Sequence, residues 1–128
     1  MPARSAHRED PAPSRESVLS KAICRAAGYM GISNAEMAQI IGVSEPTVSR
    51  LRNGKYELRD GTKPFELAQY LVRLFRGLDA IASGDDETTR SWLRSENTTL
   101  RGAPIELMKK IAGLTAVVAY VDAQRARL

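Results

Sequence analysis

Apolar residues recur at helical spacing along most of the chain, and glycine, proline and serine stand where the periodic segments begin and end. The pattern predicts helices over residues 18–29, between 33 and 42, and over 45–52. Further helices are predicted from 62 to 81, over 86–95, from 104 to 113, and from 114 almost to residue 128. The predicted fold class is therefore all-α.

The stretch from Ser33 to Asn53 predicts two short helices that meet at a tight turn. Gly42 supplies a left-handed backbone position that ends the first helix, and Ser44 is a favourable N-cap for the second. The positions whose size and spacing fit this packing are Met37, Ala38, Ile41, Val43, Pro46, Val48 and Leu51. This arrangement is typical of a helix-turn-helix, whose second helix enters the major groove of DNA.

The face of residues 45–52 that lies opposite Val48 and Leu51 predicts a DNA-reading surface. On that face, Arg50 can make a bidentate contact to guanine, and Ser49 can donate or accept at a base edge. Glu45 has two interpretations, acceptance from cytosine or a favourable charge at the helix N-terminus. Thr47, Arg52 and Lys55 are expected at phosphates, and Asn53 at a base or a phosphate. The full predicted set is Ser44, Glu45, Thr47, Ser49, Arg50, Arg52, Asn53 and Lys55.

Three segments are predicted along the chain. Residues 1–17, which contain three prolines and the only histidine (His7), are expected to form a flexible arm because they have little apolar surface to bury. Residues 18–82 form the helix-turn-helix bundle, and residues 83–128 form a small helical domain. The long helix that begins after Thr62 has an unusually wide apolar stripe, which is expected to meet either the C-terminal half or a second protomer.

The last predicted helix has two apolar faces. One carries Leu114, Val117, Val118, Val121 and Leu128, and the other carries Ala116, Ala119, Ala123 and Ala126. Arg125 adds a basic tip where a purely structural helix would favour an apolar residue. Two interpretations stay open: a helix that binds a partner, and a buried terminal helix whose last turn frays.

Composition narrows the function classes. The chain has 128 residues, 43% hydrophobic and 5% aromatic, and these values allow a packed core but disfavour broad base-stacking platforms. Its net charge of +4 includes a basic cluster between Arg50 and Arg59, which suits phosphates. A single cysteine, Cys24, excludes an internal disulfide and is expected to pack in the core. No cofactor and no metal site is predicted, an enzyme is disfavoured, and an N-terminus without an apolar signal region favours the cytoplasm.

The segment from Trp92 to Leu128 resembles the toxin-binding domain of the Xre/MbcA/ParS antitoxin family. The matching residues are Trp92, Leu93, Asn97, Leu100, Gly102, Pro104, Leu107, Gly113, Val117, Val118, Tyr120, Val121 and Asp122. The Gly102–Pro104 link is shorter than the glycine-rich turn of many relatives. The resemblance implies a type II antitoxin that covers a RES-domain, NAD-consuming toxin and represses its own operon as a dimer or larger complex.

Toxin contacts are expected at Tyr120, Gln124, Arg125, Arg127 and Leu128, because the resemblance puts the end of the chain near the toxin's active-site entrance. The predicted partners are thus a RES-domain toxin and double-stranded operator DNA. The alternative is a stand-alone helix-turn-helix regulator whose C-terminal half only dimerises.

Overall fold

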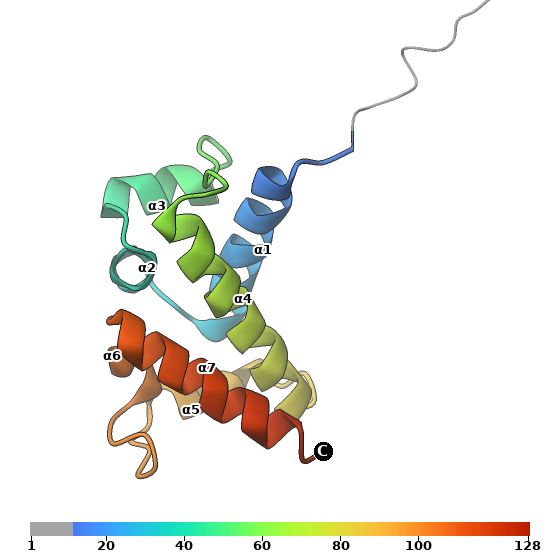
Figure 1. Cartoon of the computed structure of the whole chain (residues 1–128), viewed down its shortest axis with the longest axis vertical. Coiled ribbons are helices and arrows are strands. Elements are labelled where there is room, and N and C mark those ends of the chain that lie inside the picture. Colours follow the sequence, from blue (N-terminus) through green and yellow to red (C-terminus); the bar gives the residue numbers. More distant parts are fainter. Residues whose placement is uncertain (1–11) are drawn as a thin grey trace, which may run out of the picture.

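A computed structural model describes residues 12–128, so residues 1–11 of the predicted arm, His7 included, lie outside the described part. Within that part the chain forms seven helices and no strand, as the sequence predicted (Figure 1). The helices are α1 (Arg15–Met30), α2 (Asn34–Ile41), α3 (Glu45–Arg52), α4 (Lys63–Ile81), α5 (Asp86–Arg94), α6 (Pro104–Leu107) and α7 (Ile111–Arg125). The helix-turn-helix bundle comes first, and the smaller C-terminal helical unit follows it.

The first helix begins three residues before its predicted start. The Ser14 hydroxyl accepts a hydrogen bond from the Ser17 N–H at 3.0 Å, so Ser14 is the N-cap of α1. Residues 15–17 therefore belong to a helix and not to the predicted arm. Ser20, which lies within α1, is buried, and its hydroxyl accepts from the Leu58 N–H at 2.9 Å. Gly31, with φ of 68°, ends the helix.

The two helices of the predicted motif have the expected caps. Ser33 and Glu36 form a reciprocal capping box at the start of α2. Gly42 ends that helix with φ of 76°, and the Ser44 hydroxyl accepts from the Thr47 N–H at the start of α3. Because both caps are satisfied locally, the turn between α2 and α3 is short and its angle is fixed.

Helix α4 forms part of both halves of the molecule. Its first half packs against α1 and α2, and α7 crosses its second half (Figure 1). Its buried side chains are Phe65, Leu67, Ala68, Leu71, Val72, Leu74 and Leu78. At the crossing, a Cβ on Gly77 would lie 2.6 Å from Val121 Cγ1, so only glycine allows this close approach. The wide apolar stripe is thus explained by packing on two sides within one chain.

The boundary between the last two helices differs from the prediction. The sequence predicted one helix from residue 104 to Gly113 and a separate helix from residue 114. Instead α6 is a single turn, α7 begins at Ile111, and the Ile111 side chain is 58% exposed. A Cβ on Gly113 would lie 1.8 Å from the Leu107 carbonyl oxygen. This glycine is therefore needed where α7 passes the backbone of α6, and not as a helix terminator.

We expect Gly113→Ala to destabilise the fold by about 2–3 kcal/mol, because the added methyl group overlaps main-chain atoms that cannot move independently. The measurement is the free energy of unfolding from urea titration. The matched control is Gly28→Ala, since Gly28 lies within α1 and its Cβ would meet nothing within 4 Å. That change should stabilise by up to about 1 kcal/mol. Equal effects of the two substitutions would contradict this interpretation of Gly113.

Candidate functional site

The outer face of α3 and the residues that flank it gather the predicted DNA-binding side chains at one end of the molecule. Arg50, Asn53 and Lys55 are exposed, and neither Arg50 nor Lys55 forms an ion pair with any described residue. Of the remaining predicted residues, Ser44 and Glu45 are exposed, whereas Thr47, Ser49 and Arg52 are half-buried. Their base and phosphate contacts stay predictions.

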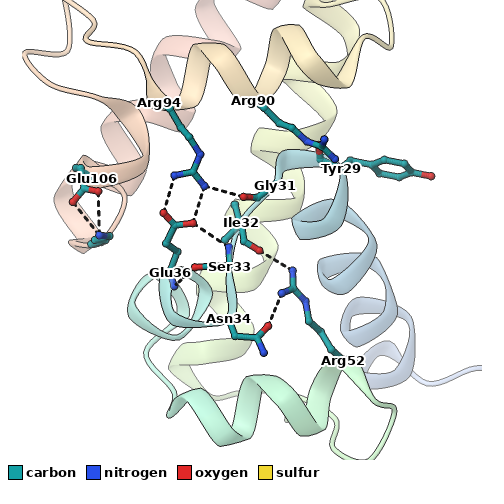
Figure 2. Close-up of polar contacts among 11 residues, drawn as sticks. Tyr29, Gly31, Ile32, Ser33, Asn34, Glu36, Arg52, Arg90, Arg94 and Glu106 are labelled. Atoms are coloured by element: carbon teal, nitrogen blue, oxygen red, sulfur yellow. Dashed lines mark hydrogen bonds and ion pairs between the residues drawn. The ribbon is translucent and has the colours of Figure 1, made fainter.

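Arg52, which is predicted to contact a phosphate, has hydrogen-bond partners within the chain. The Arg52 guanidinium donates to the Ile32 carbonyl oxygen at 2.9 Å and to the Asn34 side-chain oxygen (Figure 2). These bonds hold the end of α3 against the start of α2. A phosphate would have to share this guanidinium with two protein acceptors, so the structure gives Arg52 a role in fixing the reading helix that its spacing did not reveal.

Two arginines of α5 attach the C-terminal half to the helix-turn-helix (Figure 2). Arg94 donates to both carboxylate oxygens of Glu36, at 2.8 and 2.9 Å, and to the Gly31 carbonyl oxygen at 2.8 Å. Arg90 donates to the carbonyl oxygens of Tyr29 and Gly28 at 2.9 and 3.0 Å. These guanidinium groups donate to carbonyl oxygens at the C-terminal end of α1, where positive charge is also favoured by the helix dipole.

Glu36 is the electrostatic centre of this contact. The hydrogen bonds from Arg94 lower the pKa of its carboxyl group to about 2, with help from Ser33 and against the opposing effect of burial. The Glu36 side chain is only 16% exposed, whereas the Arg94 side chain is 45% exposed. Glu36 therefore caps its own helix and also binds α5. Sequence spacing reveals the first role but not the second.

Helix α7 is buried on one face and exposed on the other. Leu114, Val117, Val118 and Val121 are buried, as predicted. The exposed side chains are almost all apolar: Ile111, Ala112, Ala116, Ala119, Ala123 and Ala126. We call this set the alanine face. A helix that is apolar on every side is normally covered on every side, so the alanine face is suited to a protein partner.

The predicted toxin-contact residues lie beside the alanine face and at the end of α7. Tyr120 is half-buried and stacks on Trp92, with 6.1 Å between ring centroids. Tyr120 and Gln124 line a small cavity of about 190 Å³ between α4, α5 and α7. Arg125 and Arg127 are exposed, and Leu128, 79% exposed, does not continue the buried stripe of α7 as its spacing predicted. The tip of the chain is therefore accessible.

Two other kinds of site are not found among residues 12–128. No helix in this range is long and apolar enough to cross a membrane. The same range holds no group of three or more histidine, cysteine or acidic side chains placed to bind a metal ion. The acidic run Asp85-Asp86-Glu87 lies at the start of α5, where Asp85 accepts a hydrogen bond from the Glu87 N–H at 3.3 Å and caps the helix.

The fold defines a helix-turn-helix protein with a second helical unit, and comparison with protein families shows that it is of the antitoxin class. Residues 11–73 match the antitoxin Xre-like helix-turn-helix domain, and residues 77–127 match the antitoxin Xre/MbcA/ParS C-terminal toxin-binding domain. The chain therefore belongs to the Xre/MbcA/ParS antitoxin family, as the resemblance indicated. A comparison with curated proteins found no match. The two matched segments are separated by residues 74–76, which lie within α4. The domain boundary that the sequence predicted after residue 82 stays a prediction.

The pKa of Glu36 predicts an acid-dependent loss of stability. Because the folded-state pKa is about 2 and the ordinary value is 4.5, the carboxylate stabilises the fold above about pH 4.5. This contribution is lost as the pH falls toward 2. At pH 7 we expect the free energy of unfolding to be about 1–2 kcal/mol higher for wild type than for Glu36→Gln. This difference is kept small because solvent screens the exposed Arg94 side chain. Urea unfolding from pH 7 to 2 should show the difference shrink, and a constant difference would be contrary to this account.

Proposed function

We propose that this chain is the antitoxin of a type II toxin–antitoxin pair, with one surface for its toxin and another for its own operator. It neutralises a RES-domain toxin by covering the active site with α7 and the chain end, and it represses its operon through α3. The observation that carries the proposal is the alanine face: it is apolar and exposed, and it lies within the segment that matches a toxin-binding domain.

The toxin-binding role is supported by the chemistry of α7. Burial of the alanine face would remove apolar side chains from water at little cost in side-chain entropy, because alanine has no rotamers to fix. Beyond it, Arg125 and Arg127 add positive charge at an exposed tip. Such a tip can occlude the path of an anionic dinucleotide, which is the substrate class that the family resemblance implies for a RES-domain toxin.

The DNA-binding role is supported by the helix-turn-helix and by Arg50 and Lys55, cations near α3 that form no ion pair with any described residue. With α3 in the major groove, Arg50 lies on the face that reads base edges, and Lys55 follows at the end of the helix. One such small module binds weakly, so we propose a dimer or a larger complex with the toxin that places two reading helices on neighbouring half-sites.

The second candidate is a stand-alone regulator that dimerises through α7. It is favoured by the same alanine face, since small side chains also allow two helices of two copies to approach closely. Coexpression with the neighbouring gene discriminates the two. Copurification of a toxin supports the antitoxin function, whereas a stable homodimer that does not bind the product of the neighbouring gene supports the regulator function.

Arg50→Ala should weaken operator binding by about 1–3 kcal/mol, because the lost bidentate contact reads a base. Fluorescence anisotropy with an operator duplex and with an unrelated duplex measures the effect. The loss should be confined to the operator, and toxin binding should be unchanged. If both duplexes lose affinity equally, Arg50 is a phosphate ligand and not a base reader.

Ala119→Glu should reduce toxin affinity about tenfold or more, since the new carboxylate would be buried in an apolar interface. Ala119 is exposed, so thermal unfolding of the free protein should not change. Gln69→Glu, at an exposed position on α4, is the control for added charge.

Deletion of residues 125–128 should likewise impair neutralisation more than DNA binding. Full neutralisation by both altered proteins would contradict the assignment of this surface.

A further inference from the structure

A groove of about 480 Å³ runs between α1 and the C-terminal end of α3. Lys21 and Arg25 stand on its α1 side, one helical turn apart, and both are exposed. The opposite side is formed by the end of α3 and the loop that follows, from Gly54 to Glu57. Helix α1 did not enter the predicted DNA-binding set, because its cations lie far from the helix-turn-helix in sequence.

The charge of this groove is not neutralised by any other side chain among residues 12–128. Elsewhere on the described surface, five cations are held in ion pairs: Arg15, Lys63, Arg73, Arg94 and Lys109. Lys21 and Arg25 form no ion pair with any described residue, and Glu57 is the only acidic residue that lines the groove. The groove is therefore a site of net positive charge that is open to an anionic ligand.

The position of the groove identifies the anion. Helix α1 packs against α3, so its exposed cations lie beside the reading helix. When a recognition helix occupies the major groove, the sugar–phosphate backbone passes along the elements that flank that helix. Lys55, already expected at a phosphate, lies in the loop that closes the opposite side, next to Gly54 and Tyr56. The two sides of the groove are thus placed to bind one strand between them.

We propose that the groove between α1 and α3 is a phosphate-binding cleft for duplex DNA, in which Lys21 and Arg25 contact backbone phosphates next to the major groove that α3 reads. The inference rests on the proposed DNA-binding function and extends that interface to α1. Because these contacts are to phosphates, they supply affinity and orientation but no discrimination between sequences.

The test is the salt dependence of duplex binding by full-length Lys21→Ala/Arg25→Ala. Each lost phosphate contact lowers the slope of log affinity against log salt by about 0.9, so the slope should fall by about 2. Operator and unrelated duplexes should lose affinity by the same factor. The control is Arg76→Ala/Lys110→Ala, which removes two exposed cations that do not line the groove and should leave the slope unchanged. A slope equal to wild type, with wild-type binding intact, overturns the inference.

If the proposed DNA-binding function is itself wrong, the same experiment gives a different result, because wild type would then bind no duplex at any salt concentration.

Cys24 gives a second measurement, since it lines the groove and is the only cysteine of the chain. Burial raises the pKa of its thiol, so alkylation by iodoacetamide should be slow. Saturating operator duplex should slow it further by covering the groove. Protection by the toxin but not by the duplex would mean that the groove binds protein, and would overturn the inference.

Discussion

The contact between Arg94 and Glu36 is the interaction on which the arrangement of the two halves depends. It joins α5 to the first turn of α2, and Arg90 adds bonds to the end of α1. A guanidinium and a carboxylate that share two hydrogen bonds fix an orientation as well as a distance. Helix α4 provides the apolar counterpart, because it is buried by both halves. Together these contacts make the orientation of α3 relative to α7 a property of the fold and not of a linker.

Much of the fold could be predicted because its signals are local. Gly42, Ser44 and Thr62 act on residues at most four positions away, so their caps can be recognised in the sequence. The start of α1 was predicted late, since Val18 is the first apolar residue of that helix and Ser14 precedes it by a full turn. Gly113 was assigned to a helix end because the backbone of α6 that approaches it can be seen only in three dimensions.

The proposed functional surfaces, like the fold, could be predicted where their signals are local and not where they depend on packing between helices. The outer face of α3 and the four alanines of α7 at positions 116, 119, 123 and 126 follow from helical periodicity, so both could be predicted. Ile111 and Ala112 were not predicted on the alanine face, because α7 begins before its predicted start. Arg94 and Glu36 are 58 positions apart, and no pattern in the sequence pairs them. The internal partners of Arg52 and the groove beside α1 were also missed, because each depends on how helices pack side by side. The proposal of a RES-domain toxin as partner came from the family resemblance and from no feature of the residues alone.

The two surfaces lie at different ends of the helical body, α3 toward one end and α7 at the other (Figure 1). If α3 binds DNA and α7 binds the toxin, as we propose, this separation leaves room for both ligands at the same time. Native mass spectrometry of the protein mixed with its co-encoded toxin and an operator duplex tests this most directly. We expect a ternary assembly that contains all three components. Mutually exclusive complexes, in which toxin displaces duplex and duplex displaces toxin, would contradict it.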